Sequence, residues 1–243
     1  IDPIILSLGF IDIRWYGLAY VFAFISAIYL IKFLNKKIQN DINNKLIDNF
    51  FMWSVIGVIF GGRIGYVLFY QLEFFLSNPL FLIYIWKGGM SFHGGLIGII
   101  ISIYLYSKKN NLQFFALADL ISIVAPIGLF FGRIANFINT ELYGRITDFP
   151  FAIIYNNLDD NRRHPSQLYE AFFEGIFIFI ILMLISKNTM KVNKFGINTS
   201  IFLILYGFIR FFVEFLREPD SHIGYVFSYF TMGQILSVPL VLL

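Results

Sequence analysis

Two arginines and a glutamate fall on one stripe of a predicted helix near the end of the sequence. Arg210, Glu214 and Arg217 are spaced i, i+4 and i+7, so a helix places them on one face, and we expect Pro219 to end that helix. Charges in an apolar helix face a protein interior or a cavity. The stripe predicts either a structural ion network or an anion cradle. Two arginines against one carboxylate leave a surplus positive charge, which favours the cradle.

A second polar run begins inside an apolar stretch. The sequence from Gly132 to Arg145 reads GRIANFINTELYGR, and it becomes polar without a solvated linker. This indicates a helix end that unwinds into a polar pocket, with Gly132 and Gly144 permitting close backbone approach or unusual backbone dihedrals. A plain interfacial helix end is the alternative, but it does not require so many polar side chains together. The candidate binding residues here are Arg133, Asn136, Asn139, Glu141, Gly144 and Arg145.

Other chemistry-bearing residues stand more alone. His93 opens an apolar stretch and could take or give a proton near neutral pH, although a lone histidine is more often structural. Pairing His93 with Ser91 would suggest an intramembrane protease, but residues two apart point to different faces of a helix. Tyr16 and Arg63 lie in short glycine-containing runs, RWYG and GGRIGY. The latter also predicts a small-residue packing seam between helices.

Two carboxylates follow at the start of a later apolar stretch. The run HPSQLYE leads from His164 into this stretch, and its Pro-Ser pair suits a helix start. Glu170 and Glu174 then fall one turn apart on a face that we expect to point inward.

Membrane helices must position these residues. The chain is 58% hydrophobic and 14% charged, with a mean hydropathy of +0.74, and a spanning helix needs roughly 20 mostly apolar residues. The sequence therefore predicts an all-α integral membrane protein, with residues 1–243 as one membrane-embedded domain and with re-entrant or loop elements on the outer face. Long continuous runs argue against a barrel. About seven spans are expected, near 15–34, 50–70, 90–106, 114–135, 166–186, 197–216 and 225–243.

Lysines and arginines occupy opposite ends of these stretches. The lysines, except Lys87, lie in or beside the connections that follow the odd-numbered stretches, while the arginines lie at the other ends or inside the stretches. The number of lysines and arginines taken together is the same on the two sides of the membrane, but the lysine connections are short and poor in acidic residues. The positive-inside rule then predicts cytoplasmic lysine connections, an outside N-terminus and a cytoplasmic C-terminus. The arginine face would look outward.

Several kinds of chemistry are disfavoured. The chain has no cysteine, which excludes disulfides, thiolate metal sites and a cysteine nucleophile in this chain. No histidine and aspartate spacing indicates a metal site, and the charge pattern does not suggest nucleic acid as a partner. An outward pocket with several arginines suits a phosphate ester with acyl tails, because guanidinium groups match phosphate oxygens and stabilise a departing phosphate. The residues alone leave open a phospholipid enzyme or a phospholipid carrier.

Six blocks of the sequence resemble the prolipoprotein diacylglyceryl transferase family. The run GRIANFINTELYGR matches the family signature G-R-x-x-N-F-x-N-x-E-x-x-G-R, with Ala135 where the family usually has glycine. The other blocks occur in family order and cover nearly the whole chain: RWYG, GGRIGY, SFHGG, HPSQLYE and RFFVEFLREPD. The long signature makes the resemblance specific.

The resemblance implies a reaction and a location. Members move the diacylglyceryl group of phosphatidylglycerol to the lipobox cysteine thiol of a prolipoprotein, whose signal peptide lies in the same membrane. They form a thioether and release glycerol phosphate. No metal or organic cofactor is implied. The implied location is the bacterial cytoplasmic (inner) membrane, with the active site toward the outer leaflet. A phospholipid or phosphate-ester carrier with a basic cavity is the alternative.

The resemblance also suggests roles for individual residues. Arg133 and Arg210 would hold the phosphate, and His93 is a candidate base for the thiol. Glu214 would position Arg210 and Arg217. The remaining members of the expected substrate site are Tyr16, Arg63, Asn136, Asn139, Glu141, Gly144 and Arg145.

Overall fold

The computed structural model describes residues 3–7, 12–38, 43–85, 89–189, 194–219, 225–226 and 229–242. Lys87 and the last residue of the RFFVEFLREPD block, Asp220, lie outside the described residues. Backbone contacts divide the chain into two compact units, Ile1–Ile38 with Asp119–Leu243 and Gln39–Ala118. The expected single domain over 1–243 stays a prediction.

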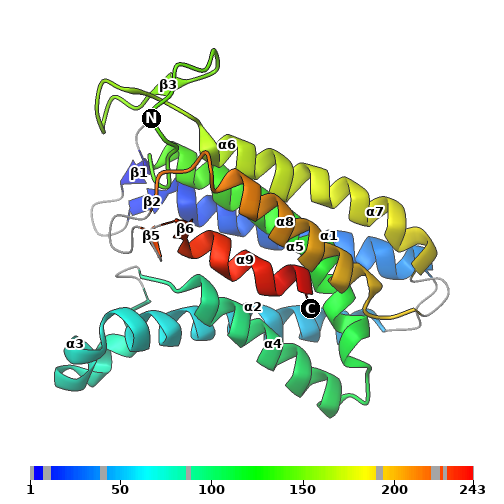
Figure 1. Ribbon diagram of the computed structural model, residues 1–243. Coiled ribbons are helices and arrows are strands. Elements are labelled where there is room, and N and C mark those ends of the chain that lie inside the picture. Colours follow the sequence, from blue (N-terminus) through cyan, green and yellow to red (C-terminus); the bar gives the residue numbers. More distant parts are fainter. Residues whose placement is uncertain are drawn as a thin grey trace. The chain divides into compact units, whose positions relative to one another are not determined.

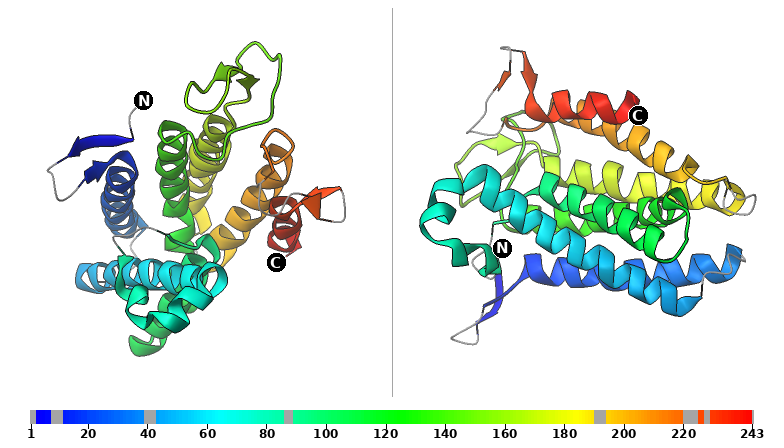
Figure 2. Two further views of the ribbon diagram at one scale, coloured as in Figure 1. Left: turned by 90° about the vertical axis from the view of Figure 1, so that its left-hand side faces the viewer. Right: turned by 90° about the horizontal axis from the view of Figure 1, so that it is seen from below.

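Among the described residues of the first unit, long helices and three short antiparallel hairpins make up the fold (Figure 1). The hairpins lie at the same end of its helices, as the right-hand view of Figure 2 also shows. The sequence predicted only loops or re-entrant elements there, so these brief strand pairs are an addition. The elements are β1 (Ile4–Ser7), β2 (Asp12–Arg14), α1 (Trp15–Ile38), α5 (Phe114–Ile138), β3 (Ile153–Ile154), β4 (Arg162–Arg163), α6 (Ser166–Glu170), η3 (Ala171–Phe177), α7 (Ile178–Thr189), α8 (Ile197–Val213), β5 (Tyr225–Val226), β6 (Phe230–Thr231) and α9 (Met232–Leu242).

The second unit is built on a close pair of helices. Its elements are α2 (Asn44–Tyr70), α3 (Leu72–Ser77), η1 (Pro79–Ile83) and α4 (Phe92–Lys109). A Cβ atom added at Gly61 would lie 2.3 Å from the carbonyl oxygen of Gly94, and one added at Gly98 would lie 2.0 Å from that of Gly57. Only glycine permits this approach. The predicted small-residue seam is therefore confirmed.

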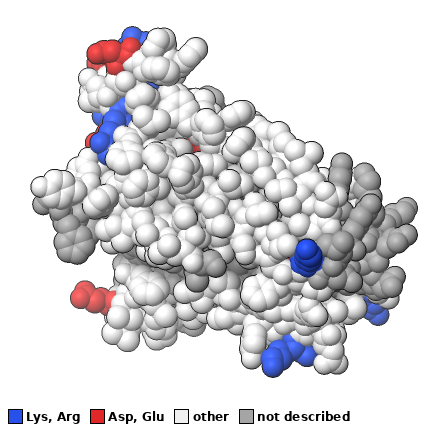
Figure 3. All heavy atoms as spheres, turned by 45° about the vertical axis from the view of Figure 1, so that its right-hand side comes forward, with Lys and Arg blue, Asp and Glu red and all other residues white. Residues whose placement is uncertain are grey.

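Each predicted span contains helix, and the helices suit a membrane. Within the described residues, four helices are long and apolar enough to cross one: Trp15–Asn35, Asn44–Tyr70, Phe114–Ile138 and Ser166–Ser186. Many large apolar side chains are exposed on the helices, and the face in Figure 3 is formed mostly by uncharged residues, with charges toward its margins. The protein is thus mostly helical and of membrane type. The count of seven and the orientation stay predictions.

The last helix begins later than the sequence predicted. Tyr225–Val226 and Phe230–Thr231 pair as the strands β5 and β6, and α9 starts at Met232. The backbone N–H of Gln234 donates to Thr231 Oγ1 at 3.3 Å, and the N–H of Thr231 donates to Gln234 Oε1 at 3.0 Å. This reciprocal capping box fixes the start of the helix.

A buried carboxylate caps α8 from another helix. Gly196 stands at the N-cap with a φ of 92° and offers no side chain to the free N–H groups. The carboxylate of Asp119, on α5, takes the place of the missing N-cap side chain. One carboxylate oxygen accepts from the Gly196 N–H at 2.8 Å, and the other accepts from the N–H of Thr199 at 2.8 Å and its hydroxyl at 2.7 Å. Asp119 is 1% exposed, so this cap ties α8 to α5.

We expect Asp119→Ala to destabilise the protein. Hydrogen bonds to a charged acceptor contribute roughly 1.5–3 kcal/mol each, and their loss leaves buried donors unsatisfied. A loss of about 2 kcal/mol corresponds to a drop of roughly 4–8 °C in Tm for a chain of this size. Thermal unfolding in detergent checks this, with Asp148→Ala, at an exposed carboxylate, as the control. Equal Tm values for the two variants would contradict the capping role.

Candidate active site

Three arginines and three glutamates gather in one buried cluster of the first unit. Helix α5 supplies the first arginine, the α6–η3 segment supplies two glutamates, and α8 with the turn after it supplies the other three residues. Side-chain exposure ranges from 0% to 13%. Charges buried to this degree are stable only when they are paired. The six residues, called the charge cluster below, are Arg133, Glu170, Glu174, Arg210, Glu214 and Arg217.

Arg133 contacts two carboxylates along one edge of its guanidinium. Its Nε lies 2.8 Å from Glu170 Oε2. Its Nη2 donates to Glu174 Oε2 at 3.1 Å, and Nε lies 3.3 Å from the same oxygen. No hydrogen bond is seen from Nη1 to any of the described residues. Arg133 is also the most exposed member of these ion pairs in the charge cluster, at 13%. Its outer edge is therefore available to an anion.

Arg210 is enclosed more completely. Its Nη1 donates to Glu170 Oε1 at 2.9 Å and lies 3.8 Å from Glu174 Oε1. Its Nη2 lies 2.6 Å from Glu214 Oε2, which is the ion pair that the sequence spacing suggested. Both terminal nitrogens of Arg210 thus face carboxylates, and Glu170 joins Arg210 to Arg133.

The helix that carries Arg210 ends earlier than predicted. It stops at Val213 rather than continuing to Pro219, so Arg217 lies outside it. Arg217 instead pairs across an isolated antiparallel bridge with Gly144, and the carbonyl of Leu216 accepts from the N–H of Arg145 at 3.0 Å. These tertiary bonds replace the last helical turn. Arg217 Nη1 still lies 4.0 Å from Glu214 Oε2.

The sequence predicted a surplus of positive charge in this cluster, and that prediction is wrong. That expectation weighed two arginines against Glu214 alone. Glu170 and Glu174 bring the balance to three positive and three negative groups. Their position one turn apart on an inward face was visible in the sequence, but their pairing with arginines on other helices was not. An anion would therefore bind to guanidinium N–H groups that no carboxylate occupies, and not to an unpaired positive charge.

Helix α9 closes the cluster beside Glu214. A Cβ atom added at Gly233 would lie 2.7 Å from Glu214 Oε1. Gly233 is the second residue of α9, so the Glu214 carboxylate lies against the first turn of that helix. A larger residue at this position would push Glu214 away.

The run after Arg133 unwinds as predicted. Helix α5 ends at Ile138, and Thr140 and Leu142 take positive φ values of 58° and 56°. The N–H of Glu141 donates to the carbonyl of Asn136 at 2.9 Å. Asn139 Nδ2 donates to Glu141 Oε1 at 3.4 Å. The helix end thus turns back on itself and keeps its polar residues together.

The two glycines of this run behave differently. A Cβ atom at Gly144 would lie 2.3 Å from the carbonyl oxygen of His164, so the predicted close approach is confirmed there. Gly132 has no neighbour within 4 Å of such an atom and is not among the described glycines with a positive φ, so neither close approach nor a left-handed backbone is seen there. Arg145 donates from Nε to the carbonyl of Arg217 at 2.9 Å and lies 5.8 Å from the ring of Tyr225.

Two buried polar residues that the sequence did not single out hold this run in place. Gln167 Nε2 donates to the carbonyl oxygen of Glu141 at 2.6 Å. The Tyr155 hydroxyl donates to Gln167 Oε1 at 2.8 Å. Gln167 is 0% exposed, and burial raises the pKa of Tyr155 to about 12, so the phenol keeps its proton. The block HPSQLYE is the only sequence signal for this link.

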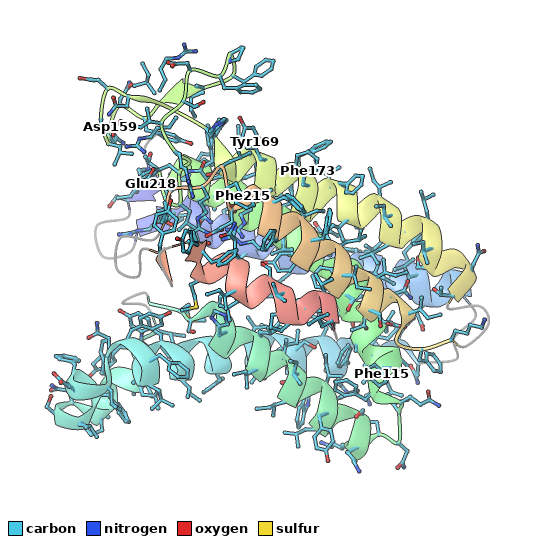
Figure 4. All side chains as sticks on the ribbon, viewed as in Figure 1. Phe115, Asp159, Tyr169, Phe173, Phe215 and Glu218 are labelled. Atoms are coloured by element: carbon cyan, nitrogen blue, oxygen red, sulfur yellow. The ribbon has the colours of Figure 1, made fainter. Side chains whose placement is uncertain are left out.

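An ion-pair group steadies the adjoining hairpin. Arg163 Nη2 donates to Asp159 Oδ2 at 2.6 Å, and its Nη1 lies 3.3 Å from Glu218 Oε2. Figure 4 labels both carboxylates at this end of the unit. The guanidinium holds the pKa of Asp159 at about 2. Arg163 also donates to the carbonyl of Gly144 at 3.3 Å, so the hairpin braces the signature run.

Tyr16 belongs to the same unit as the charge cluster. It is the second residue of α1, is partly buried, and its ring packs against that of Tyr20 in a tilted arrangement, with 5.3 Å between ring centroids. It interacts electrostatically with Glu141 and Arg133, which places its hydroxyl in their neighbourhood.

Arg63 and His93 belong to the second unit. Arg63 is 2% exposed and donates to the carbonyls of Phe81, Leu82 and Gly89, so it holds the connection between α2 and α4. His93 is an exposed residue in the first turn of α4, while Ser91 Oγ accepts from the Gly94 N–H as a helix cap. Substrate contacts by Arg63 and His93 stay predictions.

The described part of the first unit can therefore bind an anion but offers no metal site. No group of three or more His, Asp or Glu side chains there could hold a metal ion. Arg133 presents guanidinium N–H groups beside the polar run of residues 136–145. This combination suits a phosphate with a hydroxyl-bearing headgroup.

Known proteins resemble the whole chain. The family described as Prolipoprotein diacylglyceryl transferase matches residues 3–243. Proteins named phosphatidylglycerol–prolipoprotein diacylglyceryl transferase are 47% identical in Rickettsia bellii and 48% identical in Rickettsia typhi. Both alignments cover 100% of this chain and 92% and 94% of the respective relative. A match of this extent shows that the chain belongs to the prolipoprotein diacylglyceryl transferase family.

Proposed function

We propose that this protein transfers the diacylglyceryl group of phosphatidylglycerol to the lipobox cysteine of prolipoproteins. The observation that carries this function is the full-length match to relatives that bear this activity in their name. The acceptor is a signal peptide in the same membrane, and the donor is a membrane lipid. The chain has no cysteine, so the reacting thiol belongs to the substrate.

The reaction requires charge stabilisation at one oxygen. The cysteine sulfur attacks the glyceryl carbon, the S–C bond forms, and the C–O bond to phosphate breaks. The bonding electrons stay with the phosphate, which leaves as glycerol phosphate with added negative charge. Donors already aimed at that oxygen lower the barrier. In this proposal Arg133 supplies such donors directly through its open Nη1 edge, and Arg210 contributes through Glu170 and through its positive charge.

Other residues orient the headgroup and the thiol. Tyr16, Asn136 and Glu141 lie around the unwound end of α5 and would bind the glycerol hydroxyls, with Asn139, Gly144 and Arg145 shaping the run. A thiol with a pKa near 8.5 is already a few per cent thiolate at neutral pH. His93 remains the candidate base that would take the proton from the thiols that are still protonated.

The balanced charge cluster explains how the site stays folded without lipid. Each arginine is paired with a carboxylate before substrate arrives, so no charge is left buried alone. Phosphate then adds to the outer edge of Arg133. Arg210 acts mainly through Glu170, which connects it to Arg133, and through the positive field that it adds.

The proposal includes a membrane arrangement. Seven spans would leave the N-terminus outside and the C-terminus in the cytoplasm of a bacterial inner membrane, with one embedded domain over residues 1–243. The unwound run and the hairpins of the first unit lie at one end of its helices (Figure 1), and that end would face the outer leaflet. The lysine-rich connections support this direction.

The wild-type protein should modify a lipobox peptide. We expect purified protein supplied with phosphatidylglycerol and a lipobox peptide to yield a peptide heavier by one diacylglyceryl group, together with free glycerol phosphate. Mass spectrometry of both products checks this. A peptide with the cysteine replaced by serine serves as the control, since it lacks the thiol. Unmodified peptide with lipid moved between leaflets would indicate a carrier instead, and a cut peptide would indicate a protease.

We expect Arg133→Lys and Arg210→Lys to lose turnover by about 100-fold or more, the scale of removing a preorganised donor. Lysine keeps the charge but cannot span two acceptors with a planar fork. Initial rates at saturating phosphatidylglycerol measure the effect. Arg162→Lys, at an exposed arginine of the hairpin, is the matched control and should keep its rate. Wild-type rates in either cluster variant would rule out the fork requirement.

The orientation can be read from single cysteines, because the chain has none of its own. The cells are first stripped of their outer membrane while the inner membrane stays intact. A maleimide that cannot cross the inner membrane should then label Ile5→Cys and Arg162→Cys. Lys108→Cys and Leu242→Cys should be labelled only after lysis. The cysteine-free protein is the blank. Labelling of Leu242→Cys before lysis would exclude an odd number of spans with an outside N-terminus.

A further inference from the structure

We propose that Glu174 is a positioning residue for the transfer reaction. It fixes the Arg133 guanidinium so that the Nη1 edge is presented to the phosphate. The inference rests on the proposed function, because it assigns a purpose to an arginine that would otherwise be only part of an ion network.

The contacts of Arg133 define which edge is held. Glu174 Oε2 lies 3.1 Å from Nη2 and 3.3 Å from Nε, and Glu170 Oε2 lies 2.8 Å from Nε. Both carboxylates therefore hold the Nε–Nη2 edge. A planar guanidinium fixed along one edge has its opposite edge fixed as well.

Glu170 alone cannot do this work. Its Oε1 accepts from Arg210 Nη1 at 2.9 Å, so only Oε2 remains for Arg133. One contact at Nε leaves the guanidinium free to rotate about that contact. The second contact, from Glu174 to Nη2, removes the rotation.

The backbone around Glu174 has an unusual form. Residues Ala171–Phe177 make a π-helical segment between α6 and α7. π-Helical turns are rare in proteins as a whole, and those that do occur often lie at functional sites. Within this segment Phe173 is exposed and points away from the helices (Figure 4), while Glu174 is 0% exposed. The segment therefore directs one carboxylate inward from a surface that is otherwise apolar.

A glycine brings this segment close to α5. A Cβ atom added at Gly175 would lie 2.7 Å from Phe130 Cβ and 3.0 Å from its Cα. Phe130 and Arg133 are three residues apart on α5, so they are neighbours on its surface. Contact at Gly175 thus sets the distance over which Glu174 reaches Arg133.

A double-mutant cycle tests the inference. We expect Glu174→Gln to lower kcat about tenfold and Glu174→Ala about 100-fold, the scale of a roughly 1 Å displacement of a catalytic group. The KM for phosphatidylglycerol should change less than threefold, because the loss concerns charge that develops in the transition state. In an Arg133→Ala background, Glu174→Gln should cause no further loss, since it acts through Arg133.

Control measurements separate the possible failures. Glu73→Gln, at an exposed carboxylate of α3, should keep wild-type kcat. Thermal unfolding in detergent shows whether each variant is folded, and the isosteric Gln variant keeps the test valid if the Ala variant does not fold. A wild-type protein without transfer activity would overturn the proposed function. An active wild type with unchanged kcat in Glu174→Gln, or with equal losses in both backgrounds, would overturn the positioning role.

Discussion

The carboxylate shared between Arg133 and Arg210 is the contact on which the site depends. Glu170 holds one arginine with each of its oxygens, at 2.8 Å and 2.9 Å, and is fully buried. It thereby joins α5, α6 and α8 through two buried ion pairs, and the one with Arg210 is also a hydrogen bond. Such a contact is strong when complete and costly when broken. Glu174 and Glu214 complete it from either side, so the arginines stay in place before any lipid arrives.

The sequence predicted the helices, the unwound end of α5 and the pairing of Arg210 with Glu214. Apolar stretches of about 20 residues marked the helices, because burial in lipid demands such lengths. The signature run predicted the unwound end of α5, and the spacing of Arg210 and Glu214 predicted their pairing. These features are local. They depend on residues within one or two turns of each other, which a single sequence displays directly.

The remaining features depend on partners far along the chain. Glu170 and Glu174 pair with Arg133 only because two segments far apart in the sequence pack together. The spacing of the two glutamates does not show which residue they pair with. Helix α8 stops at Val213 because the residues after it bond to the run around Gly144. Pattern and propensity would have continued it to the next proline. The substitution of a tertiary bond for a helical turn is invisible to periodicity.

Helices α5 and α8 are joined at two places along their lengths. Asp119 caps the start of α8, and the Arg133–Glu170–Arg210 link joins the two helices near their other ends. A helix advances 1.5 Å per residue, so sliding α8 by a single residue would break both connections at once. These two helices therefore keep a fixed register. Any opening that admits a two-chain lipid must move other helices around this pair and leave the pair itself intact.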